Sequence, residues 1–141
     1  MGKLDFAKNF EPEKYCIKDF NYWMICIRGK HPTLGDAVVL LKREIKSFAD
    51  LKPEESLEFP SVINWYEKTC IKKFGAVRFN YTVMMMRDNY IHYHAFPRYD
   101  KSFSLFGIEW KDEDWPKAIN YKNGIELEDD VLFNIIDFMK D

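Results

Sequence analysis

The stretch that most constrains the fold runs from Asn80 to Tyr99 and reads NYTVMMMRDNYIHYHAFPRY. Its second half is rich in β-prone and apolar residues, which predicts a strand over Asn89–Phe96 that stops at the proline after it. Successive side chains of a strand point to opposite faces of the sheet. Tyr90, His92 and His94 are therefore expected in a row on one face, backed by an apolar face.

Hydrophobic runs on either side of this stretch predict further strands. The runs with β-branched, aliphatic or aromatic character are Phe20–Ile27, Asp36–Lys42, Ala76–Met86 and, as a marginal fifth strand, Phe103–Ile108. We expect the first to be buried on both faces and the second to lie antiparallel to it across a loop that contains Gly and Pro. A turn at Arg87–Asn89 would join the third strand to the histidine strand.

Apolar residues at helical spacing predict one long helix from about Pro60 to Phe74. The stripe consists of Phe59, Ile63, Tyr66, Cys70 and Phe74. Pro53 fits the first turn of a helix, but Pro60 would be costly inside one. The long helix is therefore expected to start at Pro60 or to follow a short turn, and to stop at Gly75.

The ends of the chain add a second helix and an arm. Glu128–Lys140 carries two adjacent apolar stripes and acidic residues in its first turn, which predicts a C-terminal helix. Residues 1–18 predict only an N-terminal arm or a short helix. The expected fold is α+β, with an antiparallel sheet of about five strands, one long helix and the C-terminal helix. One domain would span residues 1–141, with its core at about 20–115 and a C-terminal extension over 116–141.

Charge and hydropathy exclude several classes of partner. The net charge of −2 gives no basic excess, so we expect no nucleic acid polymer as a partner. No apolar run approaches the ~18 residues of a membrane span, and charged residues interrupt the N-terminal segment where a signal peptide would be apolar. The sequence thus predicts a soluble, cytoplasmic protein without a membrane partner.

The row of Tyr90, His92 and His94 leaves three interpretations open. The histidines could be hydrogen-bonded structural residues. They could bind a metal through neutral imidazoles, although no third ligand lies at an indicative spacing among His31, Asp36, Asp88 and Asp100. Alternatively, a neutral imidazole could attack a phosphate and form a covalent phospho-enzyme intermediate without a metal.

The cysteines offer a weaker alternative. Cys16, Cys26 and Cys70 are widely spaced and form no Cys-x-x-Cys pair, which is typical of reduced thiols. Cys26 falls in a predicted strand and Cys70 on the helix stripe, so both are expected to be packing residues. A catalytic cysteine that works with a distant histidine is the remaining possibility for these side chains.

The run His92–Tyr99, HYHAFPRY, resembles the signature of the histidine triad (HIT) superfamily. That signature is His-φ-His-φ-His-φ-φ followed by Pro-Arg-Tyr, where φ is apolar. Three other segments resemble the family in the same order: Lys30–Arg43, Ala49–Glu55 and Phe74–Tyr81. The resemblance covers about residues 20–115 and is greatest to bacterial HIT proteins of the diadenosine polyphosphate hydrolase type.

This resemblance implies a HIT-like fold and a function. The protein would be a nucleotide hydrolase or nucleotidyl transferase that acts on the α-phosphate of a dinucleoside polyphosphate or related nucleotide. It would work through a nucleotidyl-histidine intermediate, without a cofactor, as a homodimer. His92 matches the nucleophile and His94 the histidine that contacts phosphate and leaving group, while Asn80 matches a residue at the phosphate end of the pocket. Tyr90 stands where the first triad histidine would be and would contact the nucleotide.

Two positions depart from the family pattern. Tyr90 replaces the first histidine, and Asp36 stands where many members carry a histidine that orients the nucleophile. Asp36 could orient His92 and favour its protonated form, which would weaken the nucleophile. A non-catalytic or weakly active nucleotide-binding module is therefore the alternative function.

The sequence also suggests roles for a loop histidine, an arginine and a run of methionines. His31 is expected to be a solvent-exposed loop histidine. Arg98 could neutralise phosphate but fits a structural role at least as well. Met84–Met86 would suit the floor of a purine pocket, because methionine side chains are adaptable.

Overall fold

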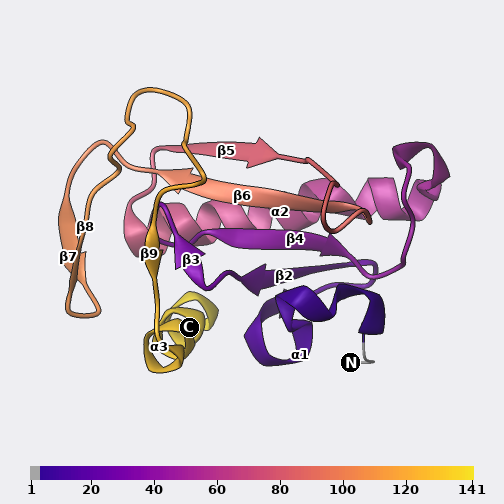
Figure 1. Cartoon of the computed structure of the whole chain (residues 1–141), viewed down its shortest axis with the longest axis horizontal. Helices are drawn as coiled ribbons and strands as arrows, with labels where there is room; N and C mark the ends of the chain where they lie inside the picture. Colours follow the sequence, from indigo (N-terminus) through magenta and orange to yellow (C-terminus); the bar gives the residue numbers. More distant parts are fainter. Residues whose placement is uncertain (1–3) are drawn as a thin grey trace.

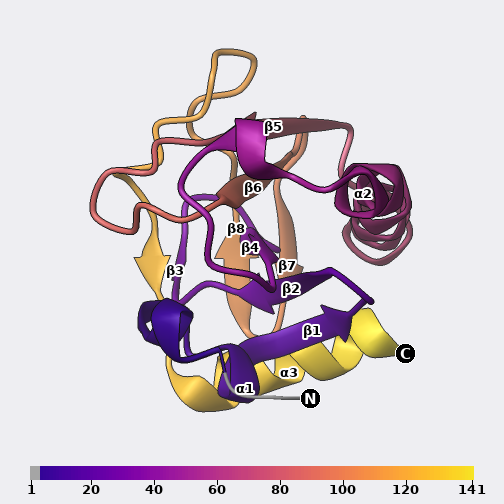
Figure 2. The ribbon, with the colours of Figure 1, turned by 90° about the vertical axis from the view of Figure 1, so that its right-hand side faces the viewer.

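A computed structural model, which describes residues 4–141, contains one five-stranded antiparallel sheet in the order β1-β2-β4-β6-β5. These strands are β1 (Cys16–Asp19), β2 (Trp23–Ile27), β4 (Ala37–Leu41), β5 (Arg78–Thr82) and β6 (His92–Arg98). The long helix α2 (Pro53–Phe74) lies on one side of the sheet, and the N-terminal segment lies on the other (Figures 1 and 2). The predicted α+β class with an antiparallel sheet is confirmed.

Strands β2 and β4 form the middle of the hydrophobic core. They pair antiparallel from Trp23 opposite Leu41 to Ile27 opposite Ala37, and every residue of both strands is buried. Burial on both faces explains their continuous apolar sequences, because neither face of the sheet meets water here. Both the burial of the first predicted strand and its antiparallel partner are confirmed.

Strand β6 begins three residues and ends two residues later than predicted, at His92 and Arg98 instead of Asn89 and Phe96. Pro97 therefore lies inside the strand and does not end it. Pairing of β6 with β4 ends at Ala95, so no residue of β4 lies opposite Pro97 and needs the N–H that proline lacks. At the other end, residues 83–91 form a loop, so the third predicted strand stops at Thr82.

Helix α2 is one continuous helix of 22 residues, and the prediction that it starts near Pro60 was wrong. Pro60 lies in its interior, where it cannot bond to the carbonyl oxygen of Ser56. Both residues are exposed, so water can satisfy that carbonyl. The helix ends at Gly75, whose φ of +80° is the left-handed conformation expected of a C-terminal glycine.

The buried face of α2 differs slightly from the predicted stripe. Its buried residues are Glu55, Val62, Tyr66, Cys70 and Phe74, whereas Phe59 and Ile63 are only half-buried. The sequence stripe thus identified three of the five buried positions. The predicted C-terminal helix is present as α3 (Asp129–Lys140), which packs beside β1 and α2 and buries Leu132, Ile135, Ile136 and Met139.

The fifth strand of the sheet is not the one predicted. Residues 103–110 instead form a separate hairpin of β7 (Phe103–Leu105) and β8 (Ile108–Trp110). Its two turn residues, Phe106 and Gly107, have φ values of +57° and +72°, as a tight hairpin turn requires. The fifth place in the sheet belongs to β1, from the segment predicted as an arm or short helix.

The N-terminal segment covers the sheet face opposite α2. It consists of the 3₁₀ helix η1 (Asp5–Phe10) and the short helix α1 (Pro12–Tyr15). A second hydrophobic cluster forms beneath it from Ala7, Val38, Leu40 and Tyr90, with Leu4, Phe6 and Phe10 packed against them. The sheet therefore separates a large core under α2 from a smaller one under the N-terminal segment.

Two short strands form a separate small sheet. Strand β3 (Lys30–His31) pairs with β9 (Ile125–Glu126), which ties the C-terminal region to the loop after β2. The 3₁₀ helix η2 (Phe48–Asp50) precedes α2. Within residues 4–141, no helix is long and apolar enough to cross a membrane.

Candidate functional site

The ring of His92 has a fixed orientation. The side chain is 3% exposed, and its Nδ1 lies 2.8 Å from the carbonyl oxygen of Tyr90. A carbonyl oxygen only accepts hydrogen bonds, so Nδ1 of a neutral ring carries the proton and donates it. The lone pair then resides on Nε2, which is the state that a histidine nucleophile requires.

His94 lies beside His92 on the same face of β6. The two ring centroids are 5.1 Å apart, and Nδ1 of His94 is buried with no hydrogen-bond partner among residues 4–141. Burial, followed by the positive charge of Arg28, lowers the pKa of His94 to about 4. His94 is therefore neutral at pH 7 and can donate a hydrogen bond through one N–H only.

Tyr90 keeps its place at the end of the row but points into the second hydrophobic cluster. Its ring lies 5.4 Å from His92 and packs edge-on against Phe6 at 5.1 Å. Its hydroxyl lies 3.4 Å from Oδ1 of Asp88. The phenol is thus largely buried under η1, whereas the backbone carbonyl of the same residue orients His92.

Both histidines line a pocket of about 300 Å³, at the lower end of the range for small-molecule sites. Its lining includes Thr82 at the end of β5, three methionines from the loop after it, and Tyr121 from the segment before β9. The charged lining residues are Arg28, Arg87 and Asp88. Met84–Met86 therefore form a pocket wall, with Met84 and Met86 largely exposed.

Asp36 does not contact His92 among the contacts of residues 4–141. The side chain is fully buried, and its Oδ2 pairs with Nη1 of Arg28 at 3.3 Å. Burial raises the pKa of Asp36 well above its usual range, and the adjacent guanidinium opposes that shift. The sequence identified Asp36 as unusual, but it gave no sign that Arg28 would be its partner.

Asn80 and Arg98 lie on the histidine face but bind each other. Nη1 of Arg98 donates to Oδ1 of Asn80 at 2.7 Å, and the backbone N–H of Ile119 donates to the same oxygen at 3.3 Å. Arg98 also forms two hydrogen bonds to Asp112, at 2.6 and 2.9 Å. These contacts attach residues 112–119 to the sheet, and neither Asn80 nor Arg98 is among the residues that line the described pocket.

The rest of the Pro-Arg-Tyr motif holds the loop after β2. The hydroxyl of Tyr99 donates to the carbonyl oxygen of Leu34 at 2.7 Å. A Cβ added to Gly35 would lie 3.3 Å from Cγ of Pro97, so the loop approaches the strand closely at that residue. Pro97 and Tyr99 therefore hold the loop between Arg28 and Asp36 against β6.

His31 is buried, so its predicted exposure was wrong. Its Nδ1 accepts the N–H of Gly35 at 3.3 Å, and its Nε2 donates to the carbonyl oxygen of Arg28 at 2.7 Å. Burial lowers the pKa of His31 to about 4. A polar loop suggests exposure from sequence alone, but this ring replaces the hydrogen bonds that the loop backbone would otherwise make to water.

The structure gives little support to a metal site or to a catalytic cysteine. In the described part of the chain, no group of three or more His, Cys, Asp or Glu side chains could hold a metal ion. Cys26 and Cys70 are buried, and burial raises the pKa of both thiols. These two cysteines are packing residues, as their positions in the sequence predicted.

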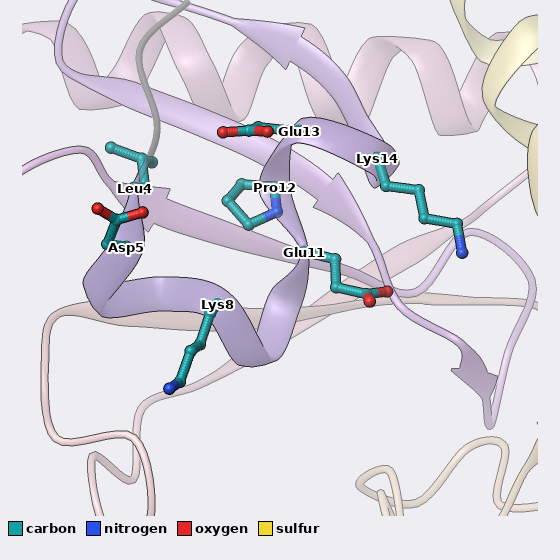
Figure 3. A pocket seen from close by; sticks show the side chains of 7 residues that line it. All are labelled: Leu4, Asp5, Lys8, Glu11, Pro12, Glu13 and Lys14. Atoms are coloured by element: carbon teal, nitrogen blue, oxygen red, sulfur yellow. The ribbon is translucent and has the colours of Figure 1, made fainter.

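A second hollow, of about 290 Å³, lies in the N-terminal segment (Figure 3). Its lining is Leu4, Asp5, Lys8, Glu11, Pro12, Glu13 and Lys14. The side chain of Lys8 extends away from that of Lys14, and the lining includes neither histidine nor cysteine (Figure 3). Because its charged groups do not converge, the histidine pocket remains the candidate site.

Solved structures with a similar fold include several histidine triad proteins. One from Marinobacter aquaeolei has a TM-score of 0.74 and 10% identity over 95% of this chain and 91% of its own. One from Sinorhizobium meliloti has a TM-score of 0.73 and 13% identity over 94% and 92%. A diadenosine triphosphate hydrolase from Plasmodium falciparum has a TM-score of 0.67 and 13% identity over 91% and 75%.

Sequence comparison adds nothing to this likeness, since no family profile and no curated protein matches the chain. The structural likeness extends over almost the whole chain at 10–13% identity. It confirms the fold expected from the motif at His92–Tyr99: the chain has the histidine triad fold.

Proposed function

We propose that the protein is a nucleotide hydrolase or nucleotidyl transferase that acts on the α-phosphate of a dinucleoside polyphosphate or a related nucleotide. Nε2 of His92 attacks the α-phosphorus, and the bond to the leaving phosphate oxygen breaks as the P–N bond forms. Water then attacks the nucleotidyl-histidine and releases the mononucleotide together with free His92. His94 hydrogen-bonds to a phosphate oxygen or to the leaving group.

One observation carries this proposal: the 2.8 Å contact between Nδ1 of His92 and the carbonyl oxygen of Tyr90. In a neutral ring this contact leaves the lone pair on Nε2, next to a second imidazole that burial keeps neutral, and both rings line a pocket. His92 and His94 line a pocket that also contains Arg28 and Arg87, and this setting suits a phosphate ligand better than a purely structural role. The likeness to a diadenosine triphosphate hydrolase supports the same chemistry.

The test is turnover of diadenosine tetraphosphate, followed by chromatography of the released nucleotides. Wild-type protein should release nucleotide, and His92→Asn should reduce the rate by at least about a thousandfold while it still binds AMP. His94→Asn should retain more activity, because it loses a hydrogen bond and not the nucleophile. Binding of nucleotides without turnover of any of them would reject the hydrolase.

A nucleotide-binding module without efficient catalysis is the second candidate. It is favoured by Phe10, whose ring centroid lies 5.1 Å from that of His92 and so covers the nucleophile. Tyr90→His discriminates between the two candidates. A large gain in rate would mean that the natural site is impaired, whereas an unchanged or lower rate in a protein that already turns over nucleotide would mean that the site works as it stands.

The remaining parts of the proposal come from the family resemblance. Asn80 would approach the phosphate end of the pocket through its amide nitrogen, because its oxygen is engaged by Arg98. Tyr90 would contact the nucleotide only if η1 moved aside. A homodimer and a cytoplasmic location also stay predictions, and the dimer can be checked by light scattering.

A further inference from the structure

Two arginine–aspartate pairs lie near the histidine strand, and they differ in how many guanidinium donors they use. Arg98 is 2% exposed, and its Nε, Nη1 and Nη2 all donate hydrogen bonds, to Asp112 and Asn80. Arg28 has a side chain 24% exposed and donates from Nη1 alone within residues 4–141, to Asp36. All three guanidinium nitrogens of Arg98 therefore donate to protein groups, whereas residues 4–141 leave Nε and Nη2 of Arg28 available to a ligand.

The available donors of Arg28 lie at the candidate site. Arg28 is one of the residues that line the pocket with His92 and His94. Its charge also acts on His94, because it is the second largest cause, after burial, of the low pKa of that ring. A guanidinium is a planar fork of donors that matches the oxygens of phosphate.

Asp36 explains why Arg28 stays at this place. Its carboxylate is 0% exposed, its Oδ2 meets Arg28, and its Oδ1 has no hydrogen-bond partner in the described part of the chain. A buried carboxylate with one long ion-pair contact costs free energy, and apolar residues often replace such pairs without loss of stability. Stability alone therefore does not account for Asp36, whereas a role in holding Arg28 does.

The sheet places this pair close to the histidines. Val38 of β4 lies opposite His94 of β6, so side chains at alternate positions of β4 share the histidine face. Asp36 precedes Val38 by two residues and therefore lies on that face, diagonally across from His94. Arg28 reaches the same region from the end of β2, two strands from β6.

We propose that Arg28 binds the anionic phosphate group of the ligand beside His92 and His94, and that Asp36 is a positioning residue that holds the guanidinium there. This inference rests on the proposed function and specifies its ligand. The site would select phosphorylated nucleotides over neutral nucleosides of the same base. During nucleotidyl transfer, Arg28 would also balance the negative charge on the phosphate oxygens.

The first experiment measures the binding of AMP and of adenosine by calorimetry, without turnover. Arg28→Gln should weaken AMP binding at least about tenfold and change adenosine binding less than about twofold, because only AMP carries the phosphate. Arg28→Lys, which keeps the charge but loses the fork, should fall between. Arg78→Gln is the matched control, since Arg78 lies on β5 over Trp115 and does not line the described pocket.

The role of Asp36 needs a readout that a merely structural residue would not change. Asp36→Asn should weaken AMP binding, and adding it to Arg28→Gln should cause no further loss, because Asp36 acts through Arg28. If the losses of the two single variants multiply in the double variant, the positioning role is overturned. Circular dichroism at the assay temperature verifies that each variant is folded.

The outcomes separate this inference from the proposed function. Equal loss of AMP and adenosine binding in Arg28→Gln, or no loss of either, overturns the role of Arg28 and leaves the hydrolase standing. Selective loss of AMP binding in a protein that turns over no nucleotide supports Arg28 and rejects the hydrolase. Failure of the wild-type protein to bind AMP overturns both.

Discussion

Nδ1 of His92 lies 2.8 Å from the carbonyl oxygen of Tyr90, so the backbone at position 90 sets the orientation of the nucleophile. The side chain of Tyr90 points elsewhere, into the cluster beneath η1. From sequence, Tyr90 was the main reason to doubt catalysis, because a phenol replaces an imidazole. The structure shows that the contact which orients His92 does not depend on the identity of that side chain.

Tyr90→Phe should therefore leave the site intact. It keeps the carbonyl that orients His92 and removes only a hydroxyl 3.4 Å from Asp88. We expect AMP binding and turnover to stay within about threefold of wild type and stability to fall by less than about 1 kcal/mol. Steady-state kinetics and urea denaturation check this, and a hundredfold loss of rate would show that the hydroxyl acts on the ligand.

The sequence predicted the elements whose apolar pattern is set by local geometry. The buried strands around Ile25 and Val39, the C-terminal helix and the row of His92 and His94 all follow from periodicity and composition. Residues 16–19 gave no such signal, because the edge strand that they form is half exposed and carries Lys18 and Asp19. Its place in the sheet depends on pairing with β2, which sequence periodicity does not encode.

The candidate site was predictable only in part, because contacts between distant elements leave no local pattern in the sequence. His92 and His94 form a local motif, and so they could be found. The partners of Arg28, Arg98 and His31 lie on other elements or across a loop, so sequence spacing did not reveal them. The start of α2 could not be predicted, because the sequence does not reveal that the carbonyl of Ser56, which Pro60 leaves free, belongs to an exposed residue.

Pro60→Ala should stabilise the protein. Alanine restores an N–H that can bond to the carbonyl oxygen of Ser56, although it also frees the unfolded chain. We expect a net gain of about 1–2 kcal/mol in the free energy of unfolding, measured in urea. Pro53→Ala is the control, because Pro53 occupies the first turn of the same helix and should give no gain. Loss of stability at position 60 would contradict the explanation.

Arg98→Lys should be strongly destabilising. Arg98 is buried, and lysine cannot reproduce its fork to Asp112 together with its bond to Asn80. Damage to a buried ion pair costs about 3–5 kcal/mol. Arg78→Lys, an exposed arginine on the same sheet, should cost less than about 1 kcal/mol. Similar losses for the two variants in urea denaturation would mean that the Arg98 network is not structural.

The contribution of His31 to stability should fall as the pH drops from about 6.5 to 4, whereas the raised pKa of buried Asp36 acts in the opposite direction. Burial lowers the pKa of His31 to about 4, so between these values the unfolded chain binds a proton that the folded protein does not. The sign is therefore loss of stability on acidification, by about 3 kcal/mol for this residue. His94, whose pKa is also lowered to about 4, acts in the same direction.

His31→Gln isolates this contribution. Glutamine can donate to the carbonyl of Arg28 and accept from Gly35, but it does not titrate. Urea denaturation at several pH values should show a steeper fall for wild type than for the variant. Parallel curves would show that His31 does not titrate differently in the folded and unfolded chains.

Phe10→Ala should expose the nucleophile. The ring of Phe10 lies 5.1 Å from that of His92 and 6.3 Å from that of His94, in the N-terminal segment that covers this face of the sheet. Its truncation removes that cover and should cost about 1–3 kcal/mol, since the side chain is half-buried.

The expected signature is faster carbethoxylation of His92 by diethyl pyrocarbonate, located by peptide mass spectrometry. The reagent attacks an unprotonated imidazole nitrogen, and in a neutral ring of His92 that nitrogen is Nε2, because Nδ1 donates to Tyr90. Phe48→Ala is the control, because Phe48 packs on Tyr93 from the opposite face of the sheet and its loss leaves His92 covered. If both variants react at the wild-type rate, Phe10 does not limit access to the histidine, and the N-terminal segment leaves the site open as it stands.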